Sequence, residues 1–229
     1  MHSVLPDGSV DLVIKVNGGV CYEYIYGTTT TKNVLSIELG SHYLGIRFKP
    51  GQSRHFLHVS AVELTDSMAL ANGLLKFDLR SVPELIEYDR VFSVLDEILG
   101  KYLHKSLPLR STIDDAISRI ESTNGSLPIT DSASIYGKSI RQFERHFRET
   151  VGISAKLFSE ITRFRRASRR ISCVALPLAQ IAADLGYTDQ SHMSREFRRF
   201  ANCSPSIFSR NHVVFLQDQH HIPIDNGGS

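Results

Sequence analysis

The stretch that decides the fold is GYTDQSHMSREFRRFANCSPSIF, residues 186–208, because an earlier stretch repeats it. Residues 137–158, GKSIRQFERHFRETVGISAKLF, align with it at an offset of fifty, and the two opening glycines are offset by forty-nine. The aligned pairs include Phe143 with Met193, Arg145 with Arg195, Phe147 with Phe197 and Phe158 with Phe208. Each copy has the pattern helix, glycine turn, helix, which is typical of a helix-turn-helix motif.

The second helix of each copy separates into an apolar back and a polar front at 100° per residue. The predicted back consists of Phe143 and Phe147 in copy one, and of Met193, Phe197 and Phe200 in copy two. The front of copy one carries Arg141, Arg145 and Arg148, flanked by Gln142 and Glu144. The front of copy two carries Ser191, Ser194, Arg195 and Arg198, flanked by His192 and Arg199. Such a helix fits a DNA major groove, which is about 12 Å wide.

Capping residues set the predicted starts of these helices. Ser139 followed by Gln142 is a capping box, and Thr188 or Asp189 can cap the later helix. Residues 154–172 between the copies are predicted to form one helix about 28 Å long, which suits two helices that read DNA about one turn, or roughly 34 Å, apart. Its second half carries five arginines that either contact phosphates or form a solvated face: Arg163, Arg165, Arg166, Arg169 and Arg170.

Charge is concentrated in the same part of the chain. Residues 110–212 contain 16 Lys and Arg against 10 Asp and Glu, a net charge of +6, and 14 of the 16 are arginine. Residues 1–109 have a net charge of −2, from 10 basic and 12 acidic residues. A basic block of this kind favours nucleic acid or another anionic surface as the partner.

Metal, secretory and membrane signals are weak. The three cysteines are far apart and predicted to be reduced, since none has zinc-site spacing, and the His220–His221 pair does not make a closed metal site. No apolar run approaches the roughly 20 residues that span a bilayer, and the N-terminus lacks a secretory pattern. We therefore expect a cytoplasmic protein without cofactor or metal.

The N-terminal half is predicted to be rich in strands. Four runs of β-branched and aromatic residues are separated by turn sequences, at residues 10–16, 21–26, 34–39 and 43–48. Residues 82–104 then change to helical spacing, with Leu85, Tyr88, Phe92, Leu95 and Leu99 as the predicted apolar stripe. Residues 106–111 are predicted to be a linker.

With both copies aligned, residues 112–212 resemble the DNA-binding domain of the AraC/XylS transcription regulators. The resemblance rests on the repeat, the two glycine turns, the paired R-x-F elements and the S-P-x-x-F ending. It implies seven helices in two helix-turn-helix subdomains that bind adjacent major-groove segments. The DNA-contacting positions implied by the resemblance and the projection together are Ser139, Arg141, Gln142, Glu144, Arg145, Arg148, Gln190, Ser191, His192, Ser194, Arg195 and Arg198.

Copy one departs from the family pattern at three places. Ser132 stands opposite Ile181, Ala155 stands opposite Pro205, and Glu144 puts an acidic group on the front of the helix. A carboxylate there either accepts a hydrogen bond from a cytosine amino group or repels phosphate, so copy one is expected to bind DNA more loosely or with another sequence preference. The elements LPDGSVDLVI and GIRFKPG resemble, less closely, the cupin-like domain that precedes the DNA-binding half in one AraC subgroup.

Together these features predict an α+β multidomain chain. Residues 1–105 form a cupin-like regulatory domain with C-terminal helices, residues 112–212 form the all-α DNA-binding domain with a long joining helix, and residues 213–229 form a flexible tail. The predicted function is that of a sequence-specific transcription regulator that is not an enzyme. Double-stranded DNA is its expected partner, RNA polymerase and an unidentified small-molecule effector are further candidates, and both a monomer and a homodimer stay open.

Two alternatives remain at the level of sequence. The chain can be a non-specific architectural DNA binder, or a cupin-type enzyme whose helices target it to DNA. The enzyme would need a metal, for which His42, His55 and His58 are the candidates, and these lack the clustered His-x-His and Glu of a metal cupin. His192 flanks the front of its helix, and catalysis by it has no support from its surroundings in the sequence.

Overall fold

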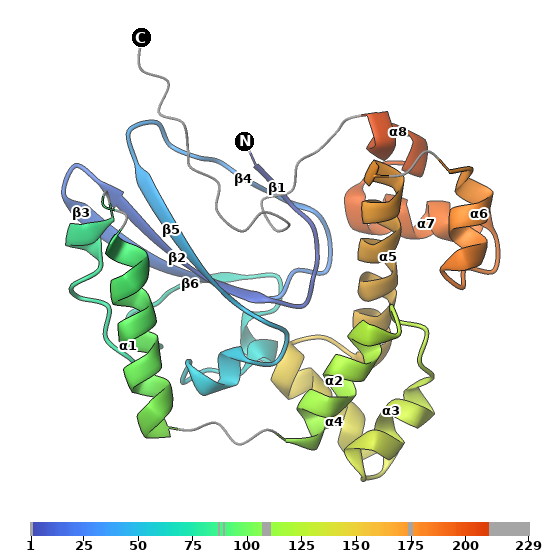
Figure 1. Cartoon of the computed structure of the whole chain (residues 1–229), viewed down its shortest axis with the longest axis horizontal. Coiled ribbons are helices and arrows are strands. Elements are labelled where there is room, and N and C mark those ends of the chain that lie inside the picture. The colour runs from blue at the N-terminus through green and yellow to red at the C-terminus, as the bar shows by residue number, and fades with distance from the viewer. Residues whose placement is uncertain (1, 87, 89, 107–110, 174–175, 211–229) are drawn as a thin grey trace.

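The computed structural model describes residues 2–86, 88, 90–106, 111–173 and 176–210 of the 229-residue chain. The predicted tail and most of the predicted linker lie outside the described residues. The described part consists of a β-rich region, residues 2–106, and a helical region, residues 111–210, which lie side by side in Figure 1. No described helix is both long enough and apolar enough to cross a bilayer.

Strands of the β-rich region form two antiparallel sheets. The strands are β1 (His2–Val4), β2 (Val10–Asn17), β3 (Val20–Tyr26), β4 (Asn33–Leu35), β5 (His42–Phe48) and β6 (Met68–Leu70). The larger sheet has the order β5-β2-β3-β6, and β1 pairs with β4. Alternation along β2 turns Leu12 and Ile14 into the core, where both are fully buried. Three of the four predicted strands are confirmed almost to the residue.

The fourth predicted strand, residues 34–39, was too long. β4 ends at Leu35, and the chain turns through Gly40, whose φ is +77°. Glu38 accepts hydrogen bonds from the side chains of Lys15 and Asn17, and its backbone N–H donates to the Tyr43 hydroxyl at 3.1 Å. These bonds hold Glu38 in place outside the sheet, and the apolar alternation of VLSIEL could not reveal them.

The predicted helix at residues 82–104 begins later than expected. Between β5 and the helix lie three short 3-10 helices, η1 (Ser53–His55), η2 (Ala61–Leu64) and η3 (Pro83–Leu85). α1 then spans Arg90–Ser106 and buries Val91 and Leu95. The predicted stripe was therefore wrong in part, because Tyr88 and Phe92 are 56% and 47% exposed. Pro83 opens η3, Ile86 and Tyr88 lie outside any helix, and α1 begins at Arg90.

The helical region has the seven helices that the resemblance implies. They are α2 (Thr112–Ser122), α3 (Ile129–Tyr136), α4 (Ile140–Val151), α5 (Ala155–Cys173), α6 (Leu178–Asp184), α7 (Gln190–Ala201) and α8 (Pro205–Arg210). Figure 1 shows α2, α3 and α4 around one end of α5, and α6, α7 and α8 around its other end. α5 confirms the predicted long helix, displaced by one residue.

The two subdomains, one at each end of α5, have the same turn and the same helix start. Gly137 and Gly186 adopt left-handed φ values of +76° and +73°, and open space surrounds the position of a Cβ at each, so the backbone conformation alone favours glycine there. Ser154 and Ser204 each accept a hydrogen bond from the backbone N–H three residues later, so Ala155 starts its helix as Pro205 does. Buried Ser132 donates to the Pro128 carbonyl at 3.2 Å, which satisfies its hydroxyl opposite Ile181.

Candidate nucleic-acid interface

The apolar backs of α4 and α7 anchor both helices. Phe143, Phe147, Met193, Phe197 and Phe200 are all fully buried, as predicted. In copy one the ring of Phe147 packs 5.6 Å from that of Phe158, and in copy two the ring of Phe164 packs 4.9 Å from that of Phe197. Aromatic contacts with α5 therefore hold each helix with its opposite face outward.

The predicted caps are present at the starts of α4 and α7. The Ser139 hydroxyl accepts a hydrogen bond from the Gln142 N–H at 3.3 Å, and the Gln142 side chain accepts one in return from the Ser139 N–H. Asp189, rather than Thr188, caps α7, and its carboxylate accepts from the His192 N–H at 2.6 Å. Ser139 and Gln142 thus cap the start of α4 and are also exposed on its surface.

We call the outer sides of the two helices the first and second reading faces. The first reading face consists of Arg141, Glu144, Arg145 and Arg148 on α4, and the second of Gln190, Ser191, Ser194, Arg195 and Arg198 on α7. The exposed site candidates are Ser139, Arg141, Gln142, Arg145, Arg148, Gln190, Ser191, Arg195 and Arg198, and the half-buried ones are Glu144, His192 and Ser194. The structure therefore brings the predicted residues together on two solvent-facing helix surfaces, one for each copy.

An ion pair holds α7 against α5 behind the second reading face. A guanidinium nitrogen of Arg163 lies 3.0 Å from Oε1 of Glu196, and the two side chains are only 16% and 7% exposed. The Arg163 guanidinium also lies over the ring of Tyr187, 4.9 Å from its centroid. Burial, followed by the charge of Glu196, raises the pKa of Tyr187 above its usual range, so this phenol stays neutral.

His192 belongs to this cluster as well as to the rim of the second reading face. Its Nε2 lies 3.6 Å from Oε1 of Glu196, and its ring meets that of Tyr187 edge-on at 5.3 Å. The other Glu196 oxygen has no hydrogen-bond partner in the part of the chain that the structure describes. Sequence reasoning missed this cluster, although one signal was present: Glu196 falls among Met193, Phe197 and Phe200 at the spacing of the buried stripe.

Some of the arginines of α5 form ion pairs within the chain. Arg163 is turned inward, so it fits neither of the two alternatives for the run, a phosphate contact or a solvated face, and Arg170 pairs with Asp184 of α6 at 2.9 Å. Glu160 of the same helix pairs with Arg199 of α7 at 2.9 Å. The exposed residues of the predicted run are Arg166 and Arg169. These ion pairs make α5 a scaffold for the second subdomain, as its contact with Phe147 does for the first.

Copy one has a His–Tyr hydrogen bond where copy two has the Arg163–Glu196 ion pair. His146, fifty residues before Glu196, accepts or donates a hydrogen bond at 2.9 Å between its Nδ1 and the Tyr136 hydroxyl. The two rings also pack with their centroids 5.5 Å apart. His146 therefore packs against Tyr136 on the inner side of α4.

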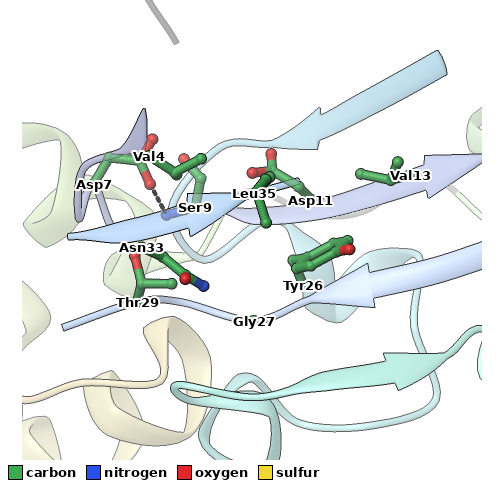
Figure 2. A pocket seen from close by; sticks show the side chains of 10 residues that line it. All are labelled: Val4, Asp7, Ser9, Asp11, Val13, Tyr26, Gly27, Thr29, Asn33 and Leu35. Atoms are coloured by element: carbon green, nitrogen blue, oxygen red, sulfur yellow. Dashed lines mark hydrogen bonds between the residues drawn. The ribbon is translucent and has the colours of Figure 1, made fainter. Parts of the chain in front are cut away.

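A second candidate site, a cavity of about 40 Å³, lies between the two sheets of the β-rich region. Figure 2 shows the side chains that line it, among them Asp7, Asp11, Tyr26 and Leu35 of β4. Arg47 engages both carboxylates, at 2.8 Å from Asp7 and 2.7 Å from Asp11. The cavity holds a few water molecules at most, and its charged groups already satisfy one another.

Metal-binding geometry is also missing from the described ranges. No three His, Cys, Asp or Glu side chains gather there in a metal-binding arrangement, and all three cysteines are free thiols. His42, His55 and His58 therefore do not form the metal site that the enzyme alternative would need.

Comparisons with known proteins match the two regions separately. Residues 132–211 match a family described as a helix-turn-helix domain, and residues 1–69 match a family described as a domain of unknown function. The arabinose operon regulatory protein of Salmonella typhimurium is 27% identical over 113 residues, which are 48% of this chain and 40% of that protein. Its Escherichia coli counterpart is 34% identical over 62 residues, which are 27% of this chain and 21% of that protein.

The chain therefore spans less than half the length of these curated relatives. Among solved structures, ToxT from Vibrio cholerae covers 93% of this chain and 96% of its own, with a TM-score of 0.50 and 11% sequence identity, a likeness of fold alone. The doubled motif, the glycine turns and the sequence matches agree. Residues 132–211 therefore match a helix-turn-helix domain family, and this region is similar to part of the arabinose operon regulatory proteins.

Proposed function

We propose that the protein is a sequence-specific DNA-binding transcription regulator. The observation that carries the proposal is the pair of reading faces, each exposed, rich in arginine, and held outward by a buried aromatic back. Phosphate contacts fix the register of such a helix on DNA, and base contacts supply the sequence preference. Arg145 and Arg195 occupy matching positions on the two faces and are the expected base-reading residues.

Residues 1–105, which include nearly all of the β-rich region, are proposed to be the regulatory domain, and residues 112–212 the DNA-binding domain. A regulator of this kind acts in the cytoplasm, where its DNA is, and needs no catalysis of its own. RNA polymerase and a small-molecule effector are further proposed partners. The cavity between the sheets is too small and too well satisfied to identify such an effector.

The test is to select the cognate site from a random DNA pool and to measure binding of Arg145→Ala and Arg195→Ala. Each substitution is expected to weaken binding by about 1–3 kcal/mol and to relax sequence preference at its own half of the site. Arg119→Ala is the matched control, because it removes an exposed arginine of α2 that lies on neither reading face. Unchanged binding by both reading-face variants would contradict the proposal.

Competition with unrelated DNA separates this function from that of an architectural binder. A sequence-specific regulator should prefer its selected site by about a thousandfold or more at physiological salt. An architectural protein would show little preference, and its affinity would fall with salt equally on every sequence.

A further inference from the structure

The C-terminal ends of the two reading helices have different surroundings. α4 is followed by Gly152 and α7 by Asn202, fifty residues later, and both residues adopt left-handed φ values, +94° and +57°. Asn202 is exposed, whereas Gly152 is buried beneath η2. A Cβ on Gly152 would lie 2.9 Å from Oγ1 of Thr65 and 3.0 Å from the Ala61 carbonyl oxygen. The β-rich region therefore covers the end of α4.

Two threonines of the β-rich region complete that covered end. The hydroxyl of Thr28 donates to the Val151 carbonyl at 2.8 Å, and the hydroxyl of Thr65 donates to the Gly152 carbonyl at 2.7 Å. Carbonyls at a helix C-terminus have no partner within the helix, and a buried carbonyl without a partner is unfavourable. The end of α4 thus finds its partners in residues more than eighty positions away in the chain.

The β-rich region contacts the first subdomain, which contains α2, α3 and α4, at two further points. Arg54 places one guanidinium nitrogen 2.8 Å from each carboxylate oxygen of Asp114, and Gln52 donates to the same carboxylate at 2.9 Å. Asp114 caps the start of α2, which packs beside α4. On the other side, Gly8 lies so close to the ring of Phe158 that a Cβ there would be 2.5 Å from it.

The contact with the second subdomain is of another kind. Lys32 lies close enough to Cys203, between α7 and α8, to oppose the rise that burial causes in the pKa of that thiol. Within the described part of the chain, the β-rich region makes no hydrogen bond to α7 corresponding to those of Thr28 and Thr65 on α4. Among the described residues, the β-rich region is therefore hydrogen-bonded to the end of α4 but not, in the same way, to the end of α7.

We propose that Thr28 and Thr65 are positioning residues for DNA reading by α4, so that the first reading face depends on the β-rich region and the second does not. The proposal rests on the DNA-binding function proposed above. In this proposal the β-rich region holds the C-terminal end of α4, and α4 binds its own DNA half-site. The β-rich region therefore affects binding at that half-site.

The experiment compares the full-length chain with Thr28→Val/Thr65→Val, which removes both hydroxyls and keeps the side-chain shape. Binding is measured on the selected site and on two derived sites, in each of which one half is scrambled. On the intact site the variant is expected to bind about tenfold more weakly, since two hydrogen bonds are lost. With the α4 half scrambled, variant and parent should bind equally, because α4 then contributes no sequence-specific contacts.

Controls separate positioning from a general loss of structure. Thr28→Ser/Thr65→Ser keeps the hydroxyls and should restore binding, and Thr31→Val, a change at an exposed threonine of the same loop, should bind as the parent does. If the double valine variant fails to fold by circular dichroism, Arg54→Met loosens the same contact from another side and should show the same half-site dependence. An equal loss on all three sites, or no loss on the intact site, would overturn the inference.

Arg145→Ala and Arg195→Ala, measured on the same three sites, distinguish the two proposals. If each arginine variant loses binding only through its own half-site, the DNA-reading function stands whatever the threonines do. If neither arginine variant loses binding, the proposed function itself fails.

Discussion

Removing Arg163 should loosen the second reading helix by a predictable amount. The guanidinium and the Glu196 carboxylate are 3.0 Å apart and together largely shielded from water. Breaking such a pair by removing one partner typically costs 3–5 kcal/mol, because the other charge stays buried. Arg163 retains some exposure, so Arg163→Met is expected to destabilise the α5–α7 contact by about 3 kcal/mol. Arg163→Met/Glu196→Met removes both charges and should cost less than about 1 kcal/mol.

Hydrogen exchange of the α7 amides is the suitable assay, because a chain with several subdomains need not unfold in one step. A loss of 3 kcal/mol corresponds to roughly a hundredfold faster exchange in residues 190–201 of the single variant. The double variant should exchange within about fivefold of the parent. Glu97→Gln is the control, since its pair with Lys101 is exposed and contributes little to stability. If the double variant exchanged as fast as Arg163→Met, the loss would come from packing and the ion-pair argument would be wrong.

Two further predictions concern the contact between the β-rich and helical regions. The pKa of Asp114 lies below its ordinary value of 3.8, because its bonds to Arg54 and to the Ser111 N–H outweigh the opposing effect of burial. The pair is therefore stabilising above about pH 4 and is lost as the pH falls through the lower, folded-state pKa, so urea titrations should show the deficit of Arg54→Met shrinking below that pH. Gly137→Ala should cost about 1 kcal/mol for its left-handed backbone alone, and Gly152→Ala clearly more, because its new methyl group meets Thr65 and Ala61; equal costs in urea unfolding would contradict the close approach.

The helical region was predictable because the sequence states its pattern twice. One amphipathic stretch fixes a helix, but two stretches at a constant offset fix the turn, the buried stripe and the outward face together. The caps at Ser139 and Asp189 follow from local hydrogen bonding, which a short window of sequence contains. The exposure of Arg145 and Arg195 follows from the burial of Phe147 and Phe197 on the opposite side.

The β-rich region was harder to predict because its structure depends on distant partners. The turn after β4 is held by Lys15 and Asn17, which belong to β2. The hydrogen bonds of Thr28 and Thr65 join residues 123 and 87 positions apart, beyond the reach of any periodicity. The inward turn of Arg163 could be predicted only in part. Glu196 at a core position of α7 indicated that a buried partner exists, but the sequence did not indicate which residue it is.

The continuous helix α5 also fixes a phase relation along DNA. Each residue inserted into its 19-residue length would turn the second subdomain by about 100° and advance it by about 1.5 Å, so one insertion would aim α7 away from a duplex that α4 still faces. Seven inserted residues would bring the rotation back to within about 20° and add roughly 10 Å, close to three base-pair steps. The length of α5 therefore sets the spacing between the two half-sites, although α5 itself need not contact a base.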